Sequence, residues 1–259
     1  MTFLQSIQSE WMKTRRSTAA VLVITGAFFI PSIIIFMRFV QREKLAAVYQ
    51  SGSFWHNHFF KNWQVMAFLL LPLGVILCVS LITQLEYRNN TWKQLHTTPQ
   101  SFTSIFFAKL TVILLMLLQF FVLFNIAIYI SAVVPLLFST KAVYPLQDIP
   151  WTDLLMVNVK FFIACLPVLA IQYLLSLRIK NFMLPLGAGI VLLVASTFAI
   201  QWEYGYMIPF TYTGYTYILN ASANPEIKMP VNILLLSVIM FAAFTIIGYW
   251  LYSSKKDKC

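Results

Sequence analysis

Few side chains in this chain are arranged for catalysis. The 259-residue sequence contains no GxxxxGK[ST] phosphate-binding loop and no HExxH or GxSxG motif. Its long apolar stretches contain no histidine and no paired carboxylates, which intramembrane proton relays and ion sites usually show. We therefore expect no active site and no bound cofactor in this chain. If the protein moves a substrate, the energy must come from another subunit.

One charged side chain lies inside an apolar stretch. Lys160 is the sole charged residue of 154–177, where a charge costs about 2.5–3.5 kcal/mol at the centre of a membrane helix. Its stem could carry the amine outward to the interface, or the amine could face a polar cavity on a substrate pathway. The sequence alone leaves both interpretations open.

A histidine pair and three cysteines are the other candidates for metal chemistry. His56 and His58 form an HxH pair in WHNHFF, but two ligands are too few for a structural metal site. The third histidine, His96, is expected on the other side of the membrane. The cysteines are far apart and form no CxxC pair: Cys78, Cys165 and Cys259. We predict neither a metal site nor a disulfide.

A polar connection between two apolar stretches is the segment richest in chemical groups. It begins at Glu86, where hydrocarbon gives way to water, and reads EYRNNTWKQLHTTPQ. Asn89–Asn90 favours a break in the helix, and 91–96 can form a short helical turn. Pro99 ends that turn, because the residue before a proline disfavours the helical region. We predict a short element lying against the membrane, either a plain loop or a docking surface for a cytoplasmic partner.

Six long apolar stretches must position these groups. Hydrophobic residues make up 60% of the chain and charged residues only 10%, against about 25% in soluble domains. About 20 apolar residues of helix cross the roughly 30 Å hydrocarbon core of a bilayer. We predict an all-α membrane protein, a single membrane domain over 1–259 with six transmembrane helices. The predicted spans are about 18–38, 64–85, 107–133, 153–177, 182–202 and 231–252.

The first 16 residues are typical of an amphipathic helix at the membrane surface. Their apolar side chains fall within about 100° of one another on a helical wheel, at 100° per residue. Basic side chains follow at the level of the headgroups. The apolar face comprises Phe3, Leu4, Ile7 and Trp11, and the basic residues are Lys13, Arg15 and Arg16. The alternative is a short frayed tail.

Basic residues set the predicted orientation. An even number of spans places both termini on one side, and with that side inside, eleven basic residues are cytoplasmic and six are outside. The positive-inside rule then places both termini in the cytoplasm. Four of the six exceptions lie at the first outer segment: Arg38, Arg42, Lys44 and Lys61. We ascribe the net charge of +10 to contacts with lipid headgroups rather than with nucleic acid.

Two further segments depart from plain spans. The apolar stretch 110–140 is longer than a bilayer requires, so it either tilts or ends near Val134–Pro135. The last outer segment, 203–230, is rich in tyrosine and poor in charge, which favours short helices dipping into the outer leaflet against the other spans. Simple anchoring and a role in substrate release both remain open for it.

These features together resemble the permease subunit of an ABC-2 type ATP-binding-cassette exporter. The resemblance rests on the amphipathic stretch Phe3–Arg16, on Glu86, on the connection NNTWKQLHTTPQSFTSIFFAKL, on the tight turn Arg178–Asn181 and on the aromatic segment before the last span. The size and the TWKQLHTTP stretch are most similar to small bacterial permeases that protect against lantibiotics or bacitracin-like peptides. The family often has a glycine where Asn90 stands, so the sequence departs from the family's pattern at that position.

The resemblance implies roles and partners. Phe3, Ile7, Trp11, Arg15 and Arg16 would belong to a connector helix, and Glu86, Asn90, Thr91, Trp92, Leu95 and Pro99 to an element that couples the permease to the ATPase. The partners would be nucleotide-binding ATPase subunits, which hold ATP and Mg²⁺, and a second permease, identical or homologous. An amphipathic substrate would be expelled outward across the plasma (inner) membrane of a bacterium. The competing interpretation is a membrane sensor or assembly factor that transports nothing, with a membrane enzyme third.

Overall fold

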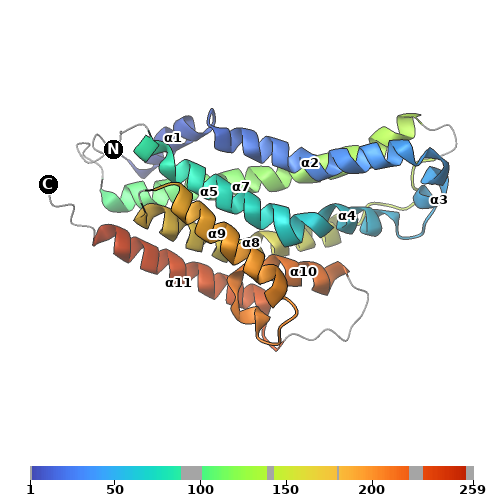
Figure 1. Ribbon diagram of the computed structural model, residues 1–259. Helices are drawn as coiled ribbons and strands as arrows, with labels where there is room; N and C mark the ends of the chain where they lie inside the picture. The colour runs from blue at the N-terminus through green and yellow to red at the C-terminus, as the bar shows by residue number, and fades with distance from the viewer. Residues whose placement is uncertain (1, 89–100, 139–142, 180, 222–229, 255–259) are drawn as a thin grey trace.

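The chain forms an elongated bundle of helices. The computed structural model describes residues 2–88, 101–138, 143–179, 181–221 and 230–254, with only the backbone described at 85–88. In these ranges five helices are long and apolar enough to cross a membrane, and they lie side by side in Figure 1. They are α2 (Thr18–Val40), the continuous helix Phe54–Gln84, α7 with its extension η3 (Phe102–Phe138), α8 (Trp151–Arg178) and α11 (Ile233–Ser253). An all-α, multi-pass membrane protein is therefore confirmed.

The predicted span at 182–202 falls on a shorter helix. Helix α9 (Met183–Ala199) has 17 residues, which rise about 26 Å at 1.5 Å per residue and fall short of a 30 Å hydrocarbon core. In Figure 1 it starts at the end of the bundle where α1 lies and stops part-way along it. Beyond it the chain turns through the short 3₁₀ helices η4 (Gly205–Met207) and η5 (Pro209–Thr211). Six complete crossings therefore stay a prediction.

The first outer segment, which joins the first two predicted spans, is largely helical. It contains η1 (Arg42–Lys44), α3 (Leu45–Tyr49) and α4 (Phe54–Val65). Helix α4 continues through a π-helical turn, η2 (Met66–Leu70), into α5 (Leu71–Arg88). The helix thus begins ten residues before the predicted span at 64 because its aromatic side chains are buried, and this packing outweighs the local polarity.

The centre of the bundle is built from aromatic rings. Trp63 and Phe161 are fully buried and stack with ring centroids 3.9 Å apart and planes 3° apart. Phe124 meets the same indole edge-on at 5.0 Å. Offset and edge-to-face pairs add roughly 0.5–1.5 kcal/mol each beyond the burial of their area. This cluster ties α4, α7 and α8 together.

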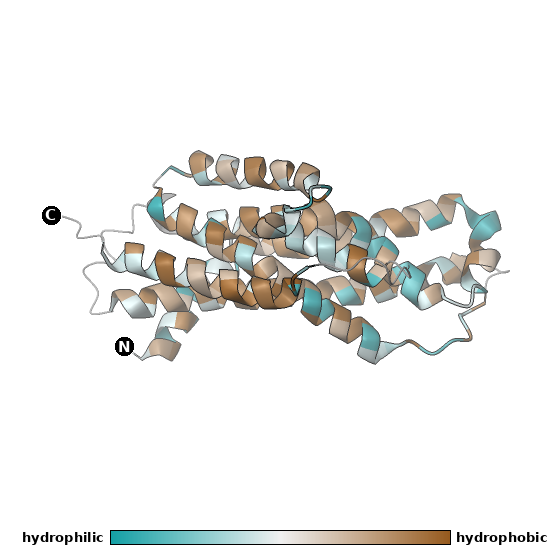
Figure 2. Ribbon diagram, turned by 90° about the horizontal axis from the view of Figure 1, so that it is seen from below, coloured by the Kyte–Doolittle hydropathy of each residue, from teal (hydrophilic) through white to brown (hydrophobic). Residues whose placement is uncertain are grey.

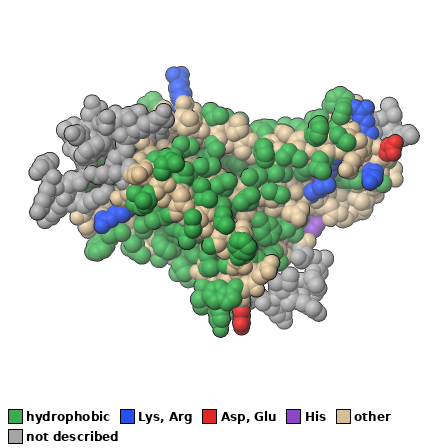
Figure 3. Space-filling view, in the orientation of Figure 1, with side chains coloured by type: hydrophobic (Ala, Val, Ile, Leu, Met, Phe, Trp, Pro, Cys, Tyr) green, Lys and Arg blue, Asp and Glu red, His purple; other side chains and the backbone are tan. Residues whose placement is uncertain are grey.

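The two ends of the bundle differ from its middle. Helix α1 (Phe3–Thr14) and the last turn of α11 lie at one end, and α3 lies at the other (Figure 1). Figure 2 shows hydrophobic colours along most of the helices and hydrophilic colours gathered toward the end that carries α3. In Figure 3 the lysines and arginines lie toward the two ends of the visible face, with hydrophobic side chains between them. This banding is that of a protein set across a bilayer.

The last outer segment forms short helices that pack on the bundle. Helix α10 (Tyr212–Ala221) rests on α8, and its residues 212–216 are buried. It also contacts the π-helical turn, where Phe68 meets Tyr217 edge-on at 5.4 Å. The expected short helices resting on the spans are therefore present, and their depth in the outer leaflet stays a prediction.

The long third apolar stretch ends as α7 at Val133 and continues as η3 (Val134–Phe138).

Candidate functional site

Helix α1 docks on α7 through a polar face. Ser6, Glu10 and Thr14, spaced four apart, are buried, with Glu10 only 7% exposed. Of the predicted apolar face, Phe3 and Leu4 are 45% and 76% exposed, whereas Trp11 is half-buried and packs against the hydrophobic core, so only the first turn of that face is turned away from the protein. An apolar outer face suits a helix lying on lipid, but the membrane-surface position of α1 remains a prediction.

A buried ion pair fixes this docking. The carboxylate of Glu10 lies 4.0 Å from the amine of Lys109 on α7 and 2.6 Å from the amine of Lys13 on its own helix. The Lys109 side chain is only 3% exposed. Buried charges are tolerated where they are paired. The pair therefore joins the start of the chain to α7 two turns after that helix begins at Phe102.

The predicted coupling residues lie mostly outside the described residues. Glu86 is on the last turn of α5, but only its backbone is described. Asn90, Thr91, Trp92, Leu95 and Pro99 fall in 89–100, which is outside the described ranges. In the predicted connector, Arg15 and Arg16 are exposed just after α1, whereas Ile7 and Trp11 are half-buried. The coupling role of these residues stays a prediction.

Lys160 contacts the short helix α10. Its amine donates a hydrogen bond to the side-chain oxygen of Asn220 at 2.8 Å, and the amide nitrogen of Asn220 donates to the carbonyl of Thr216 at 2.7 Å. Lys160 is half-buried and lines none of the cavities described below. The structure thus gives Lys160 a specific polar partner, and its place on a pathway stays a prediction.

The predicted histidine pair is split. The ring of His58 is buried; its Nδ1 lies 2.8 Å from the guanidinium of Arg38 and its Nε2 lies 3.0 Å from the carbonyl of Ile128. His56 is exposed and packs on the ring of Phe60. The two rings therefore point to different surroundings.

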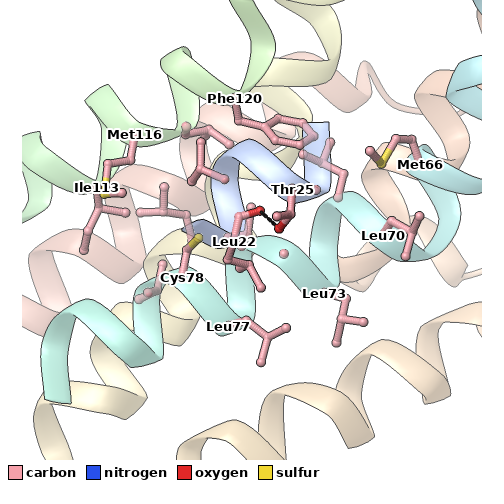
Figure 4. Close-up of a pocket in the computed structure, with 18 of the residues that line it drawn as sticks. Leu22, Thr25, Met66, Leu70, Leu73, Leu77, Cys78, Ile113, Met116 and Phe120 are labelled. Carbon is pink, nitrogen blue, oxygen red and sulfur yellow. Dashed lines mark hydrogen bonds between the residues drawn. The ribbon is translucent and has the colours of Figure 1, made fainter. Parts of the chain in front are cut away.

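An apolar cavity of about 280 Å³ lies between α2, α5 and α7. Figure 4 shows leucines and methionines from these helices around it, with Cys78 on one wall. The hydroxyl of Thr25 is bonded to the backbone carbonyl of Val21 on its own helix at 2.9 Å. With its polar groups satisfied in this way, the cavity suits a hydrocarbon chain rather than a polar ligand.

A larger cavity, of about 490 Å³, lies between α4, α7 and α8. Its walls are aromatic and aliphatic apart from His58 and a pair of amides, Asn125 and Asn158. Each side chain donates to the oxygen of the other at 2.9 Å, so the two amides satisfy one another. An apolar cavity with a few convergent polar groups is the usual form of a site for an amphipathic small molecule.

Sequence reasoning missed the groups that make most of these contacts. The polar stripe Ser6, Glu10 and Thr14 was visible as a four-residue spacing that predicts one helix face. Asn125 and Asn158 were visible as isolated amides in apolar stretches, where a polar side chain needs a partner. No sequence signal joined Glu10 to Lys109 or Arg38 to His58, because those pairs depend on how the helices pack.

Comparison with known proteins points to one family. Residues 6–196 match the family model described as ABC-2 family transporter protein. No curated protein and no solved structure matches the chain. The matched range includes α1 from Ser6 onward with its buried stripe, the ion pair and the paired amides.

Proposed function

This chain belongs to the ABC-2 transporter family, and we propose that it is the permease subunit of an exporter driven by a separate ATPase. Two permease subunits, identical or homologous, would enclose a pathway in a bacterial plasma membrane, with all termini in the cytoplasm. ATP and Mg²⁺ would be bound by the partner ATPase subunits. The observation that carries the proposal is the ion-paired docking of α1 on α7.

That docking supplies a route for force. The segment 89–100 joins α5 to α7, and α1 is held to α7 two turns beyond that segment by Glu10 and Lys109. A partner that pushes on α1 and on 89–100 would therefore move the start of α7 as one unit. Force on α7 would reach α8 through Phe124 of α7, whose ring meets Trp63 of α4, and then through the stacking of Trp63 on Phe161 of α8. Coupling of this kind requires ATP to favour one membrane conformation by several kcal/mol.

The cavities suit an amphipathic substrate. The 490 Å³ space beside Asn125 and Asn158 is within the range that holds a drug-sized molecule, roughly 300–1,000 Å³. It could hold one apolar side chain or one acyl segment together with a polar group. A whole antimicrobial peptide would need the larger space between two permease subunits. We propose an amphipathic peptide or a lipid-like compound as the exported substrate.

Purification under mild detergent tests the partnership. The protein should co-purify with a soluble ATPase and with a second permease, and the reconstituted complex should export substrate only with ATP. Trp92→Glu or Leu95→Glu should leave membrane insertion intact and uncouple ATP hydrolysis from export. Gln94→Glu, at a neighbouring polar position, is the matched control. Full export by the single chain without ATP, or normal export by both charged variants, would contradict the proposal.

A further inference from the structure

A cavity at the end of the bundle opposite α1 gathers the basic residues that break the positive-inside rule. Three of the four exceptions at the first outer segment line it, namely Arg38, Lys44 and Lys61. We propose that this cavity binds a phosphate-type oxyanion, carried by a lipid headgroup or by a free phosphate compound. Binding there requires neither ATP nor a partner subunit, so it can be tested apart from export.

The guanidinium of Arg38 forms the floor of the site. It donates to the hydroxyl of Tyr49 at 3.0 Å, to the carbonyl of Ser131 at 2.9 Å and to Nδ1 of His58 at 2.8 Å. Because an arginine always carries its protons, Nδ1 must accept, and the proton of a neutral His58 ring must sit on Nε2, which donates to the carbonyl of Ile128. All three groups that accept these hydrogen bonds from Arg38 are therefore neutral.

This positive charge lacks a counter-charge among the described residues. No carboxylate in the described ranges lies within ion-pair distance of Arg38. The nearest acidic residue in the sequence is Glu43 on η1, which is exposed and does not line the cavity. A largely desolvated guanidinium without an anion is unfavourable, and an oxyanion beside it would form charge-assisted hydrogen bonds.

Two lysines complete the site at its rim. Lys44 on η1 and Lys61 on α4 line the same cavity, which measures about 350 Å³, and both are exposed. Further polar side chains of the lining are Gln41, Ser51 and Asn57, and its apolar side chains include Ile34, Leu45 and Phe54. Three cations with amide and hydroxyl groups suit a phosphate, and the apolar wall suits an attached acyl chain.

A purely structural role would explain the position of Arg38, but not the positions of the two lysines. Its bonds to Ser131 and Tyr49 hold α2 against α7 and α3, and that bracing needs no ligand. It does not explain why Lys44 and Lys61, which come from different helices and have no bracing bond, line the same cavity. Outer basic residues also weaken the charge bias that orients the chain. The two lysines are therefore the residues that point to a ligand.

Binding to the purified full chain tests the site. The probes are inorganic phosphate, dihexanoyl phosphatidic acid and the zwitterionic dihexanoyl phosphatidylcholine, each titrated while the thermal transition of the protein in neutral detergent is followed. The test variant is Lys44→Gln/Lys61→Gln, which leaves Arg38 and its bracing in place. The matched control is Arg42→Gln, since Arg42 stacks on Phe39 at 3.8 Å and lines a different cavity.

We expect phosphatidic acid to stabilise the wild-type protein and Arg42→Gln equally, and to bind the double-lysine variant at least about tenfold more weakly. If the lipid stabilises the protein and inorganic phosphate does not, the ligand is a lipid headgroup. If both stabilise it, a free phosphate group is sufficient for binding. The proposal is overturned if neither anion binds, if phosphatidylcholine binds as tightly as phosphatidic acid, or if Arg42→Gln loses as much affinity as the lysine variant.

Discussion

Glu10 on α1 and Lys109 on α7 meet in a buried ion pair, although two long helices lie between them in the sequence. The pair makes the N-terminal helix part of the transmembrane bundle rather than an independent surface element. Because Glu10 also accepts from Lys13 at 2.6 Å, one carboxylate organises two amines. A helix that was expected to lie on lipid by its apolar face is thus held to the protein by its polar face.

A double-mutant cycle measures this link. Glu10→Gln and Lys109→Met should each lower the stability of the detergent-solubilised protein, and their coupling energy should be about 1–3 kcal/mol, as for charged residues in contact. The physical reason is that each single change leaves a buried charge without this partner. Thermal or denaturant unfolding gives the four stabilities. The control cycle pairs Glu10→Gln with Arg16→Met, an exposed basic residue, and should show coupling below about 0.5 kcal/mol. Equal coupling energies in the two cycles would show that Glu10 has no specific interaction with Lys109.

The paired amides make a second prediction. Asn125→Leu leaves the side chain of Asn158 without its partner in an apolar cavity, so it should cost about 1–2 kcal/mol of stability. The double variant Asn125→Leu/Asn158→Leu should recover most of that loss, since no amide is then left unpaired. Unfolding measurements on the two single variants and the double variant check this. A double variant that loses the sum of the single losses would show that the amides do not depend on one another.

The sequence predicted the membrane-spanning architecture because that architecture follows from length and apolarity. A run of about 20 apolar residues is sufficient to identify a helix across the bilayer, and α2, α8 and α11 lie where such runs occur. Boundaries were less predictable. Helix α4 starts at Phe54 because buried aromatic rings stabilise it, and α9 stops at Ala199, a few residues before the apolar run ends at Trp202.

The candidate sites were predictable only as isolated residues. Lys160, His58 and Arg38 each stood out by type and position, but their partners Asn220, Ile128 and Tyr49 come from distant parts of the chain. Helix packing decides such pairs, and a periodic pattern carries no information about which helix lies next to which. The HxH spacing predicted no metal site, and it gave no indication that one ring would be buried and the other exposed.

A third prediction distinguishes two roles of Lys160, which are to anchor α10 and to take part in transport. Its bond to Asn220 holds α10 against α8. Lys160→Gln can still donate to that oxygen and should leave the thermal transition unchanged, whereas Lys160→Met cannot and should lose about 1 kcal/mol. Both variants should reach the membrane, and Lys160→Gln should export at the rate of the original protein. Loss of export by Lys160→Gln with an unchanged thermal transition would instead place the positive charge itself on the substrate pathway.

Two glycines of α9 test how closely that helix packs. A Cβ atom at Gly189 would lie 2.5 Å from the side-chain oxygen of Gln172 and 2.8 Å from a methyl group of Ile76, whereas a Cβ at Gly187 meets nothing within 4 Å. Gln172 is buried and donates to the hydroxyl of Ser80 at 2.7 Å, so it has little freedom to withdraw. Gly189→Ala should therefore destabilise the protein by about 1–3 kcal/mol through overpacking. Gly187→Ala, two residues earlier on the same helix, should be neutral or stabilise it by up to about 1 kcal/mol, because alanine favours the helix over glycine. Thermal unfolding of both variants gives the comparison, and equal effects at the two positions would mean that α9 does not pack closely on α5 and α8.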